Sequence, residues 1–224
     1  MLLMRDLMTR EVFTLGPEAT AADALAVCEE HRIRHIPVVE GGRLVGLLSD
    51  RDLRDASPAL QEPGGPPQIE VLKQLRVSDV MTRDPITVHP QDLVGFAAQE
   101  MYERKIDALP VVSEEPGSSG QELLGIVTST DVMRALVTLT GVHESGSQIQ
   151  VKAPDREGIL AEVAEEVRHL GANIVSVLSS PEKKFGDRTM IFRLSVEDPS
   201  TIVQSLEMAG YTAAWITIPR RPRK

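Results

Sequence analysis

Two short motifs place a hydroxyl and a carboxylate three residues apart, Ser49-Asp50-Arg51-Asp52 and Thr128-Ser129-Thr130-Asp131. Each follows an apolar run that predicts a buried strand, and each begins a segment that we predict to be a helix. Free N–H groups and the positive dipole end of a helix favour an anionic phosphate, to which the hydroxyl can also donate. The carboxylate, one helical turn further on, can accept two hydrogen bonds from the vicinal hydroxyls of a ribose. The same spacing is close to that of a capping box, which caps a helix without any ligand.

The two motifs belong to a sequence that occurs twice. Asp6-Leu7-Met8-Thr9 recurs 73 positions later as Asp79-Val80-Met81-Thr82, and Gly46 recurs 79 positions later as Gly125. The change of spacing indicates a six-residue insertion within Glu114–Gln121 of the second copy, which we predict to be a solvent-exposed loop. A period this long predicts two copies of one supersecondary unit. Two such units usually pack on each other and create two related clefts.

Each copy is predicted to have the element order β-α-β-β-α. In the first copy a strand is expected at Val12–Leu15, and a helix is expected to begin after an N-cap at Thr20. A hairpin is expected to turn at Gly41-Gly42, and the last helix to begin near Ser49. The linker Ser57–Pro67 contains four prolines and two glycines, a composition that resists regular structure.

The pattern changes past residue 140. Alternating apolar residues predict strands, a helical stripe runs from Ile159 to Val167, and a second helix is expected at Ile202–Met208. The last strand is expected at Tyr211–Ile218. The predicted order βαββαβ is that of the ferredoxin-like split βαβ unit.

Composition and charge exclude several classes of protein. The 224 residues carry a net charge of −9 with a pI of about 5.1, and aromatic residues are only 3%, so neither a basic face nor base-stacking platforms for nucleic acid are expected. No apolar run approaches the roughly 18 residues of a membrane helix, and the start does not resemble a signal peptide. We therefore expect a cytoplasmic protein.

Candidates for covalent or metal chemistry are few. The single cysteine, Cys28, falls on the apolar face of a predicted helix and is expected in the core. No histidine has metal-ligand spacing, and no metal site is predicted. The basic end, Arg220–Lys224, is expected either to be solvated or to contact an acidic partner.

Each copy resembles a CBS domain, and the pair resembles a Bateman module. The resemblance rests on the entrance motifs Asp6–Thr9 and Asp79–Thr82 and on the motifs Ser49–Asp52 and Thr128–Asp131 at the ends of the hairpins. The third unit resembles an ACT domain through Asp155–Leu160 and Gly171–Ile174. The resemblance implies an α+β fold of two CBS-type βαββα repeats packed as a pair, followed by a ferredoxin-like ACT domain. The expected boundaries are 1–56 for the first repeat, 57–75 for a linker and short helix, 76–138 for the second repeat, 139–146 for a linker, 147–219 for the ACT domain and 220–224 for the basic tail.

The CBS resemblance implies that the two clefts hold adenine nucleotides such as AMP, ADP or ATP. The residues it assigns to them are Thr14, His35, Ile36, Pro37, Ser49, Arg51, Asp52, Thr87, Ala108, Leu109, Pro110, Thr128, Thr130 and Asp131. Arg51 and Arg54 favour a di- or triphosphate in the first site, unless these arginines are simply solvated. Asp50 would repel that phosphate unless a magnesium ion lies between them.

The ACT resemblance implies an amino-acid or small-metabolite site at Asp155, Glu157, Gly158 and Asn173. Glu157 departs from the family pattern, which often has an apolar residue or a proline at this position, and it adds negative charge beside the site expected for the ligand's carboxylate. The alternative is that Asp155 caps the helix, Gly158 allows a tight turn and Asn173 begins a strand.

The sequence therefore predicts a non-catalytic, ligand-sensing regulatory protein that forms a homodimer or larger oligomer and acts through a protein partner. The order CBS-CBS-ACT is similar to that of an acetoin utilisation family, which implies a role in carbon metabolism. An interaction scaffold with vestigial nucleotide sites is the alternative. An enzyme is disfavoured because no acid/base pair or nucleophile with a base partner is evident.

Overall fold

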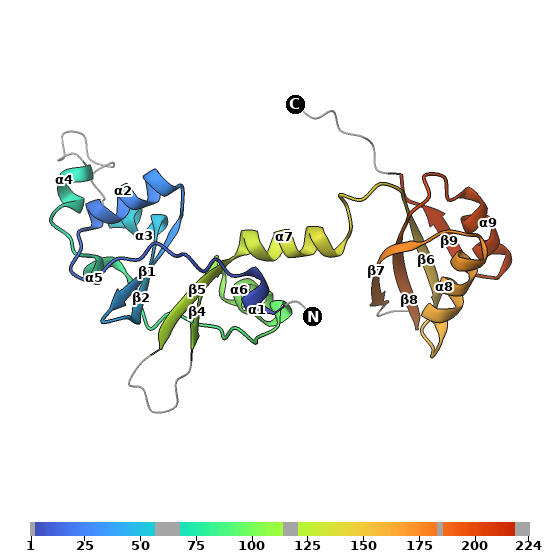
Figure 1. The fold of residues 1–224 in the computed structure, drawn as a ribbon, viewed down its shortest axis with the longest axis horizontal. Coiled ribbons are helices and arrows are strands. Elements are labelled where there is room, and N and C mark those ends of the chain that lie inside the picture. The colour runs from blue at the N-terminus through green and yellow to red at the C-terminus, as the bar shows by residue number, and fades with distance from the viewer. Residues whose placement is uncertain (1–2, 57–67, 114–120, 183–185, 218–224) are drawn as a thin grey trace. The chain divides into compact units, whose positions relative to one another are not determined.

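The computed structural model describes residues 3–56, 68–113, 121–182 and 186–217. The chain forms two compact units, Met1–Met133 and Arg134–Lys224, each described here by itself (Figure 1). The Pro-rich linker, most of the second copy's insertion and the basic tail lie outside the described residues. No helix within the described ranges is long and apolar enough to cross a membrane.

The first unit contains both sequence repeats. Its elements are α1 (Met4–Leu7), α2 (Ala21–His31), β1 (His35–Glu40), β2 (Arg43–Ser49), α3 (Asp50–Asp55), α4 (Gln68–Leu72), α5 (Val77–Val80), β3 (Thr82–Arg83), α6 (Val94–Arg104), β4 (Ala108–Ser113), β5 (Glu122–Thr128) and the start of α7 (Ser129–Leu139). The boundary between the two units falls within α7. The predicted N-cap is confirmed, because the Thr20 hydroxyl accepts a hydrogen bond from the Asp23 N–H at 3.1 Å. Each repeat presents one helix, an antiparallel hairpin and a second helix.

The predicted strand Val12–Leu15 does not form as a strand. Leu15 alone bridges to Val38 in parallel, with its N–H donating to the Pro37 carbonyl at 3.3 Å. The next bond of a parallel ladder would need an N–H from Pro37, which proline lacks. The second copy has the same single bridge, Val88 to Val111, for the same reason, because Pro110 stands where Pro37 does.

The segment that enters each repeat packs on the other repeat. Met4 of α1 is fully buried among the second repeat's apolar side chains, and its N–H donates to the Asp92 carbonyl at 2.9 Å. Conversely, Val77 of α5 is buried in the first repeat's core, and its N–H donates to the Ala19 carbonyl at 2.8 Å. The two repeats are therefore joined by a reciprocal exchange of their entry helices.

The exchange continues into the sheet. Thr9 and Ile126 of the second hairpin exchange two backbone hydrogen bonds of 2.9 and 3.0 Å. In the same way β3 pairs antiparallel with β2 of the first hairpin, Thr82 opposite Leu47. The hairpins β1–β2 and β4–β5 meet where β2 pairs with β5, giving the strand order β1-β2-β5-β4.

The second unit has the predicted βαββαβ order. Its elements are β6 (Ser147–Pro154), α8 (Ile159–His169), β7 (Ile174–Pro181), β8 (Asp187–Leu194), α9 (Ser200–Met208) and β9 (Thr212–Trp215). The antiparallel sheet has the order β7-β8-β6-β9, which confirms the ferredoxin-like prediction. The last strand is shorter than predicted.

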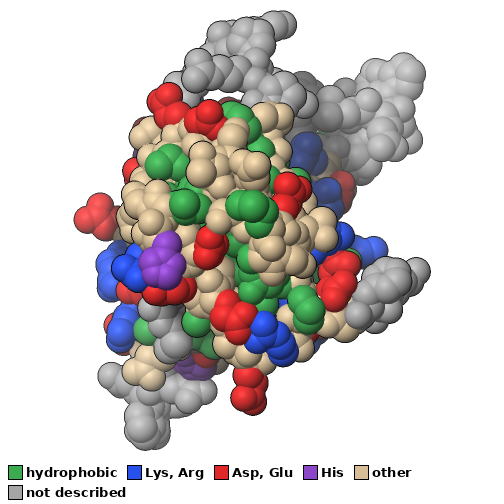
Figure 2. Space-filling view, turned by 90° about the vertical axis from the view of Figure 1, so that its right-hand side faces the viewer, with side chains coloured by type: hydrophobic (Ala, Val, Ile, Leu, Met, Phe, Trp, Pro, Cys, Tyr) green, Lys and Arg blue, Asp and Glu red, His purple; other side chains and the backbone are tan. Residues whose placement is uncertain are grey.

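One face of this sheet forms the core of the second unit. The alternate residues Ile149 and Val151 of β6 and Met190 and Phe192 of β8 are fully buried, and side chains of α8 and α9 pack on them. In Figure 2, where this unit faces the viewer, hydrophobic side chains are interspersed with charged ones. Scattered exposed apolar residues of this kind are ordinary on a protein surface.

Candidate functional site

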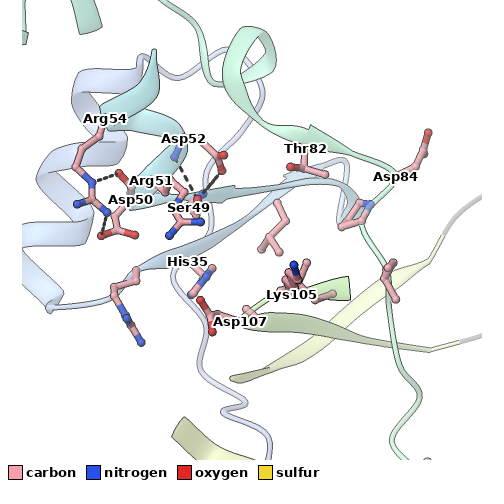
Figure 3. Close-up of a pocket in the computed structure, with 16 residues that line it drawn as sticks. His35, Ser49, Asp50, Arg51, Asp52, Arg54, Thr82, Asp84, Lys105 and Asp107 are labelled. Carbon is pink, nitrogen blue, oxygen red and sulfur yellow. Dashed lines mark hydrogen bonds and ion pairs between the residues drawn. The ribbon is translucent and has the colours of Figure 1, made fainter. Parts of the chain in front are cut away.

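A pocket of about 380 Å³ lies between the two repeats of the first unit (Figure 3). The first repeat contributes the start of β1, the end of β2 and the first turn of α3. The second contributes the segment after β3 and the end of α6 with the start of β4. The lining residues are Arg34, His35, Leu47, Ser49, Asp50, Arg51, Asp52, Arg54, Thr82, Asp84, Pro85, Ile86, Lys105, Ile106, Asp107 and Ala108.

Ser49 and Asp52 form a capping box at the start of α3. The Asp52 Oδ2 atom accepts from the Ser49 N–H and from the Ser49 hydroxyl, both at 2.7 Å (Figure 3). The Ser49 Oγ atom in turn accepts from the Asp52 N–H at 3.2 Å. The capping alternative is therefore realised, and it leaves the Asp52 Oδ1 atom without a hydrogen bond to any described residue. Capping and ligand binding are compatible here.

Thr128 and Asp131 repeat this arrangement at the start of α7. The Asp131 Oδ2 atom accepts from the Thr128 N–H at 2.9 Å and from its hydroxyl at 2.6 Å. Asp131 is only 7% exposed, and neither residue lines the pocket described above. The first repeat's Arg51 and Arg54 correspond to Thr130 and Met133 here, so the second motif lacks a cation at these two positions, and its nearest arginine is Arg134.

The pocket brings together five of the residues predicted to bind nucleotides, namely His35, Ser49, Arg51, Asp52 and Ala108. The side chains of Ile36, Pro37, Leu109 and Pro110 are buried. Thr14 lies in a separate hollow beside Arg10 and Gly125, and the Thr87 hydroxyl donates to Gln121 Oε1 at 3.3 Å. The sequence predicted two related clefts, and this pocket is lined by residues of both repeats.

Sequence reasoning did not select Arg34, Thr82, Asp84, Lys105 and Asp107, which also line the pocket. The sequence feature that could have identified them is the internal repeat. Each stands near the entry segment or the hairpin start of its copy, and an exchange of entry segments brings these regions of the two copies together.

Charges of both signs surround the pocket. Arg54 is held by Asp50 in an ion pair of 3.3 Å, and its Nε–H donates to the Asp50 carbonyl (Figure 3). Arg34, Arg51 and Lys105 make no ion pair with any described residue. Three cations without carboxylate partners beside one cavity suit a ligand that carries several negative charges.

His35 lies at the centre of the pocket with its ring toward Asp107 (Figure 3). Burial lowers the pKa of His35 below its ordinary value, and the Arg34 guanidinium lowers this pKa further. The carboxylates of Asp107, Asp50 and Asp52 oppose that shift, but burial is the largest cause. The imidazole is therefore neutral at pH 7, and it can both donate and accept a hydrogen bond.

The residues predicted for the ACT site lie around the start of α8. Asp155 does not cap that helix: its Oδ1 atom accepts from Arg188 Nε at 2.8 Å, and the N-cap is Gly158, with φ +81°. The expectation that Asp155 caps the helix is therefore wrong, because its carboxylate binds Arg188 of β8 instead. Asn173 donates its backbone N–H to the Ser195 hydroxyl at 3.1 Å, and Glu157 is exposed. Within the described residues no group of three or more His, Cys, Asp or Glu side chains could hold a metal ion.

Family comparison agrees with this architecture. The CBS domain family matches residues 4–59 and 77–138, and the ACT domain family matches residues 147–207. The chain belongs to the CBS domain family, as a tandem CBS pair followed by a C-terminal ACT domain.

Two curated relatives show how widely the CBS pair is used. The chain is 41% identical to inosine-5'-monophosphate dehydrogenase of Korarchaeum cryptofilum over 123 residues, which are 55% of this chain but only 22% of that enzyme. It is 33% identical to a CBS domain-containing protein of Dictyostelium discoideum over 138 residues, which are 60% of this chain and 91% of that protein. The match to the enzyme thus spans about a fifth of its length, whereas the match to the CBS protein spans most of it.

Solved structures resemble the CBS part of the chain. A Vibrio cholerae protein assigned as the acetoin utilization protein AcuB is 30% identical, with a TM-score of 0.52 over 64% of this chain and 96% of that one. CBSX2, solved in complex with AMP, is 28% identical, with a TM-score of 0.51 over 62% of this chain and 99% of that one. The CBS domain pair of protein MJ0100, solved with 5'-methylthioadenosine and S-adenosyl-L-methionine, is 25% identical, with a TM-score of 0.50 over 61% and 97%.

Proposed function

We propose that the chain is a non-catalytic sensor whose CBS pair binds an adenine nucleotide in the pocket around Ser49 and Asp52. The observation that carries the proposal is this cavity, which combines a hydroxyl and carboxylate pair with three cations that have no carboxylate partner among the described residues. AMP and adenosyl compounds in two similar CBS structures support the choice of ligand. Binding would regulate by favouring one arrangement of the repeats over another.

The pocket suggests a role for each group. Asp52 Oδ1 is available to accept from ribose hydroxyls, while Oδ2 stays in the capping box. Arg34, Arg51 and Lys105 supply the charge for phosphates. Because Arg54 already neutralises Asp50, a phosphate can bind there without an intervening magnesium ion. We therefore expect AMP and ADP to bind equally well with and without magnesium.

Thermal unfolding of the intact protein against AMP, ADP, ATP, S-adenosylmethionine and 5'-methylthioadenosine tests the proposal. A ligand at 100 times its dissociation constant adds about 2.7 kcal/mol of stability. Asp52→Asn is expected to abolish the shift, whereas Asp131→Asn, the matched change in the other repeat, is expected to leave most of it. If neither variant alters the shift, the pocket is not the binding site.

The C-terminal domain and the physiological role extend the proposal. We infer that the ACT domain binds an amino acid or small metabolite at the Asp155–Gly158 loop and that the chain forms a homodimer or larger oligomer. The similarity to the Vibrio cholerae protein supports a role in acetoin use through a protein partner. Deleting the gene should then slow growth of its host on acetoin as the carbon source, and unchanged growth would remove this role.

The second candidate function is a ligand-independent scaffold. It is favoured by the capping box, which fully accounts for Ser49 without any ligand. A scaffold predicts a constant oligomeric state, by light scattering, with and without saturating AMP.

A further inference from the structure

Asp107 connects the first pocket, the cavity around Ser49 and Asp52, with the start of α7. Its side chain lines this pocket beside His35 (Figure 3). Its Oδ1 atom accepts a hydrogen bond from the Ser129 hydroxyl at 3.3 Å, and its carbonyl accepts from the Ser129 N–H at 2.9 Å. Because α7 begins at Ser129, one carboxylate both lines the pocket and holds the first residue of this helix.

The described residues of the first repeat keep the backbone bond without a side-chain bond of this kind. Arg34 stands at the position of Asp107 and Asp50 at that of Ser129, and the Asp50 N–H donates to the Arg34 carbonyl at 2.9 Å. The Asp50 carboxylate is instead paired with Arg54. A helix N-terminus stabilises a negative charge and not a positive one, so Asp107 suits the start of α7 better than Arg34 suits that of α3. The carboxylate connection therefore belongs to the helix that continues toward the C-terminal domain.

The other end of α7 is attached to the sheet of the C-terminal unit. Just after the helix, the Thr140 carbonyl accepts a hydrogen bond from the Ser176 hydroxyl of β7 at 2.9 Å. A Cβ atom on Gly141 would lie 3.2 Å from the Cδ atom of Arg193, so this segment also packs closely on β8. Coupling between sites travels through hydrogen bonds and rigid elements that are in contact, and such a series leads from the first pocket through α7 to β7.

A phosphate in the first pocket would act on Asp107 through its charge. Arg34 and Lys105, which we expect to bind phosphate, line the pocket together with Asp107. Because like charges repel, a bound phosphate favours the arrangement in which the Asp107 carboxylate turns toward Ser129. Their hydrogen bond of 3.3 Å is longer than the usual O–H···O distance of about 2.7–2.8 Å, so it can shorten. A ligand without a phosphate exerts no such repulsion.

We propose that the phosphate of a nucleotide in the first pocket is signalled to the ACT domain through Asp107, Ser129 and α7. This inference rests on the proposed nucleotide site and adds how its occupancy reaches the C-terminal unit. Phosphate binding strengthens the bond between Asp107 and Ser129, fixes the start of α7 and steadies the bond between Thr140 and Ser176. A ligand shifts an equilibrium only through its differential affinity for the two arrangements, so ADP is an effector and 5'-methylthioadenosine, which has no phosphate, is not.

Hydrogen exchange of the intact protein, followed by mass spectrometry, measures the response at both ends of α7. Calorimetry first establishes saturating concentrations of ADP and 5'-methylthioadenosine. Saturating ADP should slow exchange in residues 129–140 and 174–178 at least about twofold, whereas 5'-methylthioadenosine should leave residues 174–178 unchanged. Binding of ADP with no change in residues 174–178, or equal slowing by both ligands, would overturn the proposal.

Ser129→Ala separates the connection from the binding site. This variant should still bind ADP, at most about fivefold more weakly, but should lose the slowing of exchange in residues 174–178. Thr138→Ala, which removes an exposed hydroxyl further along α7, is the matched control and should behave as the wild type. A Ser129→Ala protein that keeps the full response would contradict the proposed route.

Coupling between two sites is reciprocal, so a change at the far end of α7 should reach the pocket. Ser176→Ala should weaken ADP binding at least about twofold and leave the affinity for 5'-methylthioadenosine unchanged. Ser180→Ala, an exposed change on the same strand, is the control. Equal ADP affinity in Ser176→Ala and the wild type would overturn the route.

The ligand-free protein tests the connection by itself. Ser129→Ala should exchange at least about twofold faster than the wild type in residues 174–178, because the start of α7 is held less firmly. An unchanged rate would overturn the route whether or not a nucleotide binds. Absence of ADP binding in every protein would instead remove the proposed nucleotide site and, with it, the signal, so the two failures are distinguishable.

Discussion

At the residue scale, the first pocket contains one side chain, that of His35, whose charge state depends on burial. His35 lies between Arg34 and Asp107, and its neutral form is the one that folding favours. A neutral imidazole leaves the surrounding cations as the main positive charge that a phosphate would meet. The electrostatics of the pocket thus depend on pH through one histidine.

Stability should therefore fall in mild acid. The pKa of His35 is lower in the folded protein than in the unfolded chain, where it is about 6.5. A lowered folded-state pKa contributes stability that is present above pH 6.5 and is lost as pH falls through the folded-state value. Urea unfolding between about pH 7.5 and pH 5 should show a smaller loss of stability in His35→Gln than in the wild type. His143→Gln, an exposed change in the linker, is the control, and equal losses in all three proteins would contradict the prediction.

The single cysteine provides a second residue-scale prediction. Burial raises the pKa of the Cys28 thiol to about 11, with smaller contributions from Asp50 and Glu29. Because the thiolate is the reactive form, Cys28 should react with an aromatic disulfide reagent at pH 8 far more slowly than a free thiol does. The rate should rise to that of a free thiol in urea. Rapid reaction in the native protein would show that α2 opens readily.

At the scale of elements, two glycines make the exchange of entry segments possible. Gly46 of β2 and Gly125 of β5 stand at equivalent positions in the two hairpins. A Cβ atom on Gly125 would lie 2.7 Å from the Thr9 carbonyl oxygen, and one on Gly46 would lie 3.1 Å from that of Thr82. The entry strand of each repeat can lie against the other hairpin only because no side chain stands there.

Replacing Gly125 with alanine should destabilise the first unit. The added methyl group forces Thr9 and the Met8 side chain to move, which costs about 1–3 kcal/mol in a well-packed site. Gly95→Ala in α6 is the matched control, because nothing lies within 4 Å of its Cβ position, and its stability should be unchanged or rise by up to about 1 kcal/mol. Urea unfolding measures both, and an unchanged Gly125→Ala protein would argue against the tight crossing.

The elements also show what sequence could and could not predict. Apolar periodicity predicted the two longer helices α2 and α6 and both hairpins, and a capping motif predicted the N-terminus of α2 at Thr20, but the short entry helices α1 and α5 were not predicted. The same reasoning predicted a strand at Val12–Leu15, because it did not take into account that Pro37 has no N–H to donate. It could not show which residues of the two repeats share a site, because local patterns carry no information on which repeat an entry segment packs against. Lys105 and Asp107, contributed to the pocket by the second repeat, were missed for that reason.

At the scale of the whole molecule, the two compact units differ in how far each depends on distant segments. The C-terminal core is built entirely from residues 149–213, so it is complete within the ACT domain. The cores of the two CBS repeats are not complete in this way, since each includes a residue from the other's entry helix.

Fragments should behave accordingly. A fragment of residues 140–224 should unfold cooperatively by circular dichroism, because it retains its whole core. A fragment of residues 76–139 should not, because it lacks Met4, which is fully buried in that repeat's core. Extending the second fragment to include both repeats is the control and should restore cooperative unfolding. A cooperative transition in the single repeat would contradict this reading of the exchange.

The exchange of entry helices also determines when each repeat can fold during synthesis on the ribosome. Met4 is among the first residues made, yet Val127, with which it shares a core, is made more than half a chain later. Until then α1 has no second-repeat core to pack against. The core of the first repeat is likewise complete only after Val77 has been synthesised. We expect nascent chains to gain protease resistance in one late step, once the hairpin ending at Thr128 has left the exit tunnel, and not repeat by repeat.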